Sequence, residues 1–63
     1  MELDEHKQSL LRLPEVIKRT GLSRSTIYAY IDKGDFPKPV KIGLRAVAWH
    51  EVKIDSWIKS RVA

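Results

Sequence analysis

The sequence contains no cysteine, which excludes both a disulfide framework and a thiolate metal site. The two histidines, His6 and His50, are far apart in the chain and have no metal-ligand spacing. No apolar run approaches the roughly 20 residues of a membrane-spanning helix, and no signal-peptide pattern opens the chain. We therefore expect a soluble cytoplasmic protein that binds no membrane, needs no cofactor and holds no metal.

The chain also lacks a catalytic constellation. Its acidic residues beyond the first eight positions include no evident general acid–base pair. They are Glu15, Asp32, Asp35, Glu51 and Asp55. No nucleophile stands beside a base, and no glycine-rich loop could cradle a phosphate. The sequence predicts a protein that is not an enzyme and that has no catalytic residues.

Positive charge is what the chain has in excess. The formal net charge is +4, yet residues 1–8 carry three acidic side chains against Lys7. The rest of the chain holds eleven basic and five acidic side chains. Such an excess on a small domain attracts polyanions, although scattered basic residues also serve solubility alone. We predict a flexible tail over 1–8 and one folded domain over 9–63, near the lower size limit for a self-supporting fold.

Local signals divide this domain into short elements. Residues 10–13 form an apolar stretch that is compatible with a brief strand. Pro14 suits the first turn of a helix and Gly21 suits its end, so a helix is predicted over 14–20. Ser23 is a strong N-cap for a second helix over 24–33, which Gly34 ends.

The periodicity changes from helical to alternating after residue 35. Val40 and Ile42 alternate with Lys41, and further along the two residues Val47 and Trp49 alternate with alanines. These segments flank a glycine-bearing turn, which predicts a β-hairpin over about 38–49. A final amphipathic helix is predicted over about 51–61. Its apolar face holds Ile54, Trp57 and Ile58, with Val52 as a candidate member.

The predicted fold class is mainly α with a small β-hairpin, arranged as a winged helix-turn-helix with a C-terminal helix. None of these elements would be stable alone, so they must share one core. The predicted core consists of Val16, Ile17, Leu22, Ile27, Ile31, Phe36, Ile42, Trp49, Ile54, Trp57 and Ile58.

The first turn of the second helix carries chemistry suited to DNA. A helix-turn-helix leaves this turn protruding, with Ser23, Arg24, Ser25 and Thr26 on it. Arginine can bond guanine bidentately, hydroxyls can reach bases or phosphates, and a helix N-terminus favours a phosphate. Tyr28 is predicted to face outward one turn further along. The alternative is that Ser23 and Thr26 only cap the helix while Arg24 is a solvated charge.

Four further cations follow at the end of this helix and along the hairpin. They are Lys33, Lys38, Lys41 and Arg45. On a wing beside the recognition helix they would hold phosphates or reach into the minor groove, and otherwise they only add solubility. Trp49 and Trp57 could stack on bases. Each lies on the apolar stripe of its element, so both are predicted to belong to the core.

The stretches "LSRSTIY" and "FPKPVKIG", with the tryptophans of "AWHE" and "SWI", resemble the AlpA family of prophage transcriptional regulators. That family is related to excisionases and to the DNA-binding domain of MerR-type regulators. The resemblance runs over about 10–61 and implies a recognition helix in the major groove with a hairpin wing on the backbone. It implies helix contacts from Ser23, Arg24, Ser25, Thr26 and Tyr28, and wing contacts from Lys41 and Arg45.

One segment departs from the family's usual pattern. Members typically have serine and glycine where Ala46 and Ala48 stand. The resemblance therefore does not carry over a phosphate contact from a serine hydroxyl at this part of the wing, whereas it still carries over the basic side chain of Arg45.

Three roles remain open at this point. The chain could regulate transcription of a prophage or mobile element, or act as an excisionase that binds an attachment site. A protein-interaction adaptor is a third role, which would need a large exposed apolar patch. The expected partners are double-stranded DNA in the nucleoid, other copies of the chain on repeated sites, and integrase or RNA polymerase.

Overall fold

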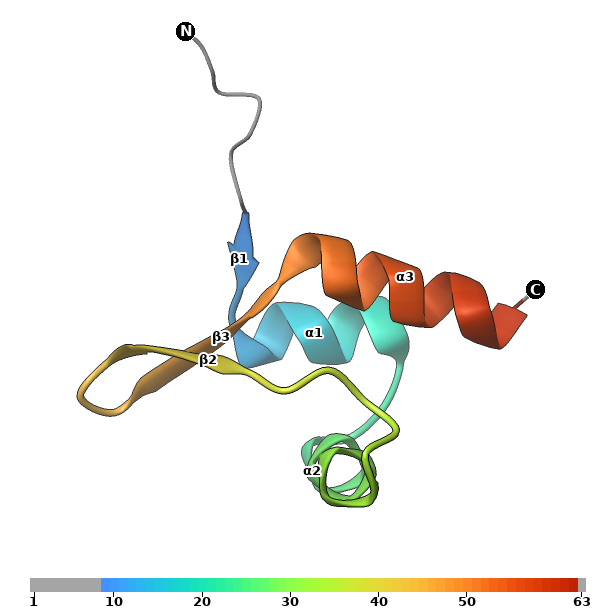
Figure 1. The fold of residues 1–63 in the computed structure, drawn as a ribbon, viewed down its shortest axis with the longest axis horizontal. Coiled ribbons are helices and arrows are strands. Elements are labelled where there is room, and N and C mark those ends of the chain that lie inside the picture. The colour runs from blue at the N-terminus through green and yellow to red at the C-terminus, as the bar shows by residue number, and fades with distance from the viewer. Residues whose placement is uncertain (1–8, 63) are drawn as a thin grey trace, which may run out of the picture.

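A computed structural model describes residues 9–62, so the tail predicted over 1–8 lies outside the described part of the chain. Three helices and three strands alternate along it (Figure 1). In chain order they are β1 (Leu10–Leu11), α1 (Leu13–Thr20), α2 (Arg24–Lys33), β2 (Val40–Gly43), β3 (Ala46–His50) and α3 (Glu51–Val62). The predicted order of helix, turn, helix, hairpin and helix is confirmed.

The turn between α1 and α2 is held by backbone geometry and one hydroxyl. Gly21 adopts φ 75° and donates its N–H to the carbonyl of Ile17 at 2.8 Å, which ends α1. A left-handed residue at this position favours glycine because a Cβ would strain the backbone. The Thr20 hydroxyl donates to the carbonyl of Val16 and accepts the N–H of Leu22 at 3.2 Å. Thr20 therefore fastens the turn as well as packing beside it.

The strands form a three-stranded antiparallel sheet in the order β1-β3-β2. The hairpin β2–β3 was predicted, and it pairs Val40 with Ala48 and Lys41 with Val47. The brief strand β1 also exists, and it pairs with the other edge of β3 so that Leu11 lies opposite Trp49. This long-range pairing makes β3 the central strand.

The core lies where the three helices meet β3. Its buried members are Leu11, Val16, Ile27, Phe36, Trp49 and Ile54. The other predicted core residues pack against them while partly buried, namely Ile17, Leu22, Ile31, Trp57 and Ile58. Ala48 is fully buried, although alternation had predicted it to face away from the core. Ala48 lies on β3, which has a neighbouring strand on each side, and a central strand is less accessible to solvent than an edge strand.

One predicted core residue, Ile42, and one candidate for the apolar face of α3, Val52, are exposed. Ile42 is 45% exposed because it lies on an edge strand whose register is irregular between Lys41 and Gly43. Such an irregularity turns a side chain away from the face that alternation predicts. Val52 is 69% exposed. It precedes the buried Ile54 by two residues, about 200° around a helix, and so lies on the opposite face of α3.

Candidate nucleic-acid interface

The arrangement of the helices and the hairpin determines which predicted DNA contacts are exposed. Figure 1 shows α2 nearly perpendicular to α1, and α3 on the side of α1 away from α2. The β2–β3 hairpin extends past the helices, and its turn is the part of the described chain farthest from them. The first turn of α2 and this hairpin are the two places where the sequence predicted contacts with DNA.

The first turn of α2 is capped, and it retains free hydrogen-bond donors. The Ser23 hydroxyl accepts the N–H of Thr26 at 3.1 Å and donates to the Thr26 hydroxyl oxygen at 3.0 Å. The predicted N-cap is therefore confirmed. This arrangement occupies the hydroxyl proton of Ser23 and leaves that of Thr26 free to donate. No acceptor among the described residues is hydrogen-bonded to the backbone N–H groups of Arg24 and Ser25, which are both exposed.

Tyr28 is oriented differently from the prediction. Its ring is half-buried and meets Trp49 edge-on, with the ring centroids 6.3 Å apart. The guanidinium carbon of Arg24 lies 5.7 Å from the centroid of the same ring. Residue 28 borders the inner stripe because Ile27 and Ile31 lie one and three positions away, on the buried side of α2. The ring thus packs on the core and supports Arg24, which remains exposed.

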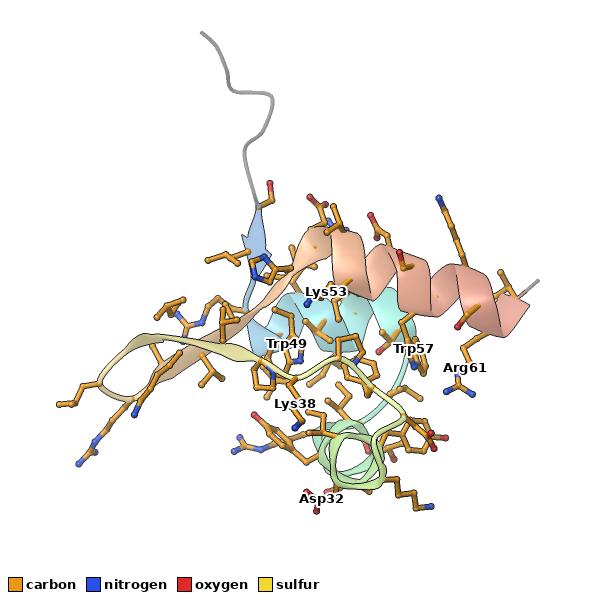
Figure 2. The ribbon with its side chains drawn as sticks, viewed as in Figure 1. Asp32, Lys38, Trp49, Lys53, Trp57 and Arg61 are labelled. Atoms are coloured by element: carbon orange, nitrogen blue, oxygen red, sulfur yellow. The ribbon has the colours of Figure 1, made fainter. Side chains whose placement is uncertain are left out.

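The hairpin carries its cations on exposed positions. Lys41 and Arg45 are exposed on β2 and in the turn, and Leu44 beside Arg45 is 89% exposed. Figure 2 shows Lys38 between the base of the hairpin and α2. Lys33 ends α2, so about 15 Å of helix separates its position from the first turn of α2. Lys38, Lys41 and Arg45 are thus distributed from the base of the hairpin to its turn, whereas Lys33 lies at the C-terminal end of α2.

Most of the acidic side chains gather elsewhere, around Arg19. Its guanidinium lies 3.1 Å from Glu15, 2.9 Å from Glu51 and 3.5 Å from Asp55, which joins α1 to α3. The hydrogen bond with Glu15, followed by that with Glu51, raises the pKa of Arg19 above its ordinary value. Only the contact between Arg19 and Glu15, four residues apart on one helix, was readable from the sequence. The three carboxylates and one guanidinium of this cluster carry a net charge of −2 between α1 and α3.

The loop between α2 and β2 is fixed by both tryptophans. The indole N–H of Trp57 donates to the carbonyl of Asp35 at 2.6 Å, and that of Trp49 donates to the carbonyl of Pro37 at 3.0 Å. Arg61 also donates to the Asp35 carbonyl at 3.3 Å and lies 4.8 Å from the Trp57 ring centroid. The predicted packing roles of the two tryptophans are confirmed. Sequence reasoning missed that they hold the loop that positions α2 relative to the hairpin.

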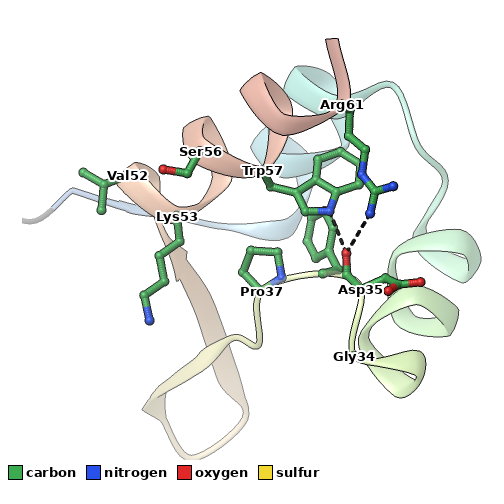
Figure 3. Close-up of a pocket in the computed structure, with 9 residues that line it drawn as sticks. Gly34, Asp35, Pro37, Val52, Lys53, Ser56, Trp57 and Arg61 are labelled. Atoms are coloured by element: carbon green, nitrogen blue, oxygen red, sulfur yellow. Dashed lines mark hydrogen bonds between the residues drawn. The ribbon is translucent and has the colours of Figure 1, made fainter. Parts of the chain in front are cut away.

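An open groove of about 670 Å³ lies over this loop (Figure 3). Figure 3 shows that the Trp57 indole and the Arg61 guanidinium both point at the Asp35 carbonyl, which is how the loop is held against α3. The indole N–H of Trp57 and the guanidinium of Arg61 are therefore already bonded to the protein's own backbone. Within residues 9–62, no group of three potential metal ligands was found. No helix in the same range is long and apolar enough to cross a membrane.

Comparison with known proteins decides the family. The sequence model of the family described as "Prophage CP4-57 regulatory protein (AlpA)" matches residues 9–62. This chain belongs to the AlpA family. The match spans α2 and the hairpin, and it confirms the resemblance read from the sequence. The observed fold is that of a winged helix-turn-helix, as expected for an AlpA-type domain.

Two relatives of this AlpA-family chain are informative. The "DNA-binding transcriptional activator AlpA" of Escherichia coli (strain K12) is 40% identical over 58 residues, which cover 82% of this chain and 83% of the relative. The "Uncharacterized protein ORF88" of Enterobacteria phage P4 is 45% identical over 60 residues, which cover 95% of this chain and 68% of the relative. The similarity thus extends over most of the chain in both cases.

Proposed function

We propose that this AlpA-family chain is a sequence-specific DNA-binding regulator of transcription in a prophage or mobile element. The observation that carries the proposal is the separation of charge over the fold. The first turn of α2 and the projecting hairpin offer exposed cations, whereas Glu15, Glu51 and Asp55 gather around Arg19 between α1 and α3. A double helix with phosphates on both sides of its major groove is complementary to the first surface and is repelled by the second.

In this proposal the first turn of α2 enters the major groove. Arg24 is supported by the Tyr28 ring and can pair with the O6 and N7 atoms of a guanine. The free hydroxyl proton of Thr26 and the backbone N–H groups of Arg24 and Ser25 can donate to a phosphate at the groove's edge. The Ser23 hydroxyl serves the cap, and the Tyr28 hydroxyl is left for a backbone contact. Figure 2 shows Asp32 on the side of α2 farthest from α1, where phosphates would repel it, so the C-terminal turn stays outside the groove.

The remaining cations then serve as backbone contacts. Lys38 lies at the base of the hairpin (Figure 2), Lys41 lies on β2 and Arg45 lies in the turn. Lys33 would reach the flanking phosphates from the end of α2. Such contacts fix the register of the protein on the duplex and carry little sequence information themselves. A single small module also buries little surface on DNA. Several copies on a repeated site are therefore expected, and contact with integrase or RNA polymerase stays a prediction.

An excisionase would use the same surface. The transcriptional role is preferred because the E. coli relative is named a DNA-binding transcriptional activator. The adaptor role would need a large contiguous apolar surface. Within the described residues, the large exposed apolar side chains are instead distributed over several elements, namely Leu10 on β1, Ile42 and Leu44 on the hairpin, and Val52 and Val62 near the two ends of α3.

The experiment that tests the proposal compares two variants of one residue. The purified protein selects its preferred duplex from a random library, and binding to that duplex is compared with binding to a scrambled one. Arg24→Ala should weaken binding to the selected duplex by about 1–3 kcal/mol, roughly 5- to 150-fold, with a smaller loss on the scrambled one. Arg24→Lys keeps the charge and loses the bidentate geometry, so it should bind both duplexes with little preference. The recognition-helix proposal is wrong if Arg24→Ala retains the parent's affinity and preference.

A further inference from the structure

The turn of the hairpin contains an apolar side chain that the fold does not use. Leu44 is 89% exposed, the highest value for a large apolar side chain within residues 9–62. An exposed leucine contributes almost nothing to the hydrophobic core, because stabilisation scales with the apolar area removed from water. Turn positions are usually filled by Gly, Asn, Asp, Ser or Pro, because these residues favour the backbone conformations of turns. Leucine offers no such conformational advantage. The side chain is therefore available for an external contact.

The surroundings of Leu44 indicate what that contact is. Arg45 follows it directly, and Lys41 is exposed on the adjoining strand. Two hairpin tips from separate copies would bring these cations together, which disfavours self-association through Leu44. A polyanion would be attracted instead. Figure 1 shows that the tip stands clear of the helices, so it can enter a narrow space.

The length of the hairpin is comparable to the spacing between neighbouring grooves of DNA. Strand β3 has five residues and so extends for about 16 Å. Half a turn of B-DNA, which separates a major groove from the neighbouring minor groove, is about 17 Å. The minor groove is only about 6 Å wide, so the side chains of the tip can enter it but the paired strands cannot.

We propose that Leu44 is an apolar wedge that inserts between two base pairs from the minor groove and kinks the duplex there. This inference rests on the proposed function. Leucine is among the side chains that unstack base steps in this way, and such unstacking bends DNA away from the wedge, toward the major groove. Arg45 and Lys41 would each hold a phosphate at the edge of the minor groove, on the two sides of the opened step. Flexible pyrimidine–purine steps are the preferred position for the wedge, because they open at the lowest cost.

The test measures bending and unstacking on the same DNA. Duplexes that carry the site selected by the parent protein are labelled at both ends for energy transfer. A second set carries 2-aminopurine, whose fluorescence rises on unstacking, at adenines along the stretch expected under the hairpin. The parent should shorten the end-to-end distance and brighten one 2-aminopurine position. It should also bind a duplex with a mismatch at that step roughly tenfold more tightly, because part of the unstacking cost is already met.

Three variants isolate the wedge. Leu44→Ser should lose the bend, the fluorescence rise and the preference for the mismatched duplex. Leu44→Met should restore all three, because it returns an apolar side chain to the same place. Val52→Ser is the matched control, since it removes an exposed apolar side chain on α3 and should behave as the parent does.

The outcomes separate this inference from the proposed function. A parent protein that binds its selected duplex without bending it, or a Leu44→Ser variant that bends it equally, overturns the wedge and leaves DNA binding standing. A parent protein that shows no binding to any duplex overturns both proposals. Because Leu44 is so exposed, the thermal unfolding curve of Leu44→Ser should match that of the parent. Matching curves would show that a loss of bending does not come from misfolding.

Discussion

The hairpin cations allow a quantitative prediction about salt. Lys41 on β2 and Lys59 on α3 are both exposed lysines, and removing either one changes the net charge by the same amount. Only Lys41 lies on the proposed DNA-binding surface, because α3 is on the side of α1 away from α2 (Figure 1). The pair Lys41→Ala and Lys59→Ala therefore distinguishes a phosphate contact from a general effect of charge.

The magnitude follows from the number of proposed phosphate contacts. These four contacts come from Lys33, Lys38, Lys41 and Arg45. Each phosphate neutralised contributes about −0.9 to the slope of log K against log salt, so the parent should have a slope of about −3.6. Between 50 and 200 mM salt its affinity should fall about 150-fold, and that of Lys41→Ala, with a slope of about −2.7, about 40-fold. Removing Arg45 as well should reduce the slope to about −1.8.

The assay is fluorescence anisotropy on one labelled duplex at five or six salt concentrations for each variant. Lys59→Ala should reproduce the parent's slope within error. Equal slopes for Lys41→Ala and the parent would refute the proposed contact and leave Lys41 as a solubilising charge. A slope lowered equally by Lys59→Ala would mean that the whole charge of the domain acts, without a defined binding face.

Two stability predictions concern the turn on which α2 depends, and both can be followed by thermal unfolding in circular dichroism. Ser23→Ala removes the cap of α2 and should cost about 1 kcal/mol, a fall of roughly 4–8 °C in Tm, whereas Ser25→Ala inside the helix should change little. Gly21→Ala meets no atom within 4 Å but forces an alanine to φ 75°, which should cost about 1–2 kcal/mol. Gly43→Ala, whose added Cβ would lie at an ordinary 3.5 Å from Ala46, is its control, and equal stability of these two variants would contradict the role given to Gly21.

The elements themselves were predictable because their signals act over a few residues. Ser23 caps α2 by accepting the N–H of Thr26, three residues along. Gly21 and Gly34 end the two helices by adopting left-handed φ angles of 75° and 81°. Such interactions require only neighbours in the chain, so they are present in any fold that contains the segment. The hairpin was predictable for the same reason, since alternation and a short turn are local features.

Two of the differences come from contact between distant segments. The pairing of β1 with β3 makes β3 a central strand, and this buries Ala48. The irregular register of β2 leaves Ile42 exposed, and the packing of Tyr28 against Trp49 turns a predicted outward residue partly inward. No window of a few residues contains both strands β1 and β3, or both Tyr28 and Trp49, so periodicity could not predict these two contacts. The exposure of Ile42 comes instead from an irregularity within the hairpin, which simple alternation does not represent.

The sequence by itself determined the chemistry of the candidate interface, because an arginine, hydroxyls and a helix N-cap in one short segment stay together in every conformation. Tertiary structure alone decided which of the cations share a face. Trp57 and Trp49 fasten the loop between α2 and β2 to α3 and β3, and this directs the hairpin beside the helix. Arg19 draws three acids to the opposite part of the fold. The physical reason is that charge acts through space, so its pattern on a surface exists only once the chain has folded.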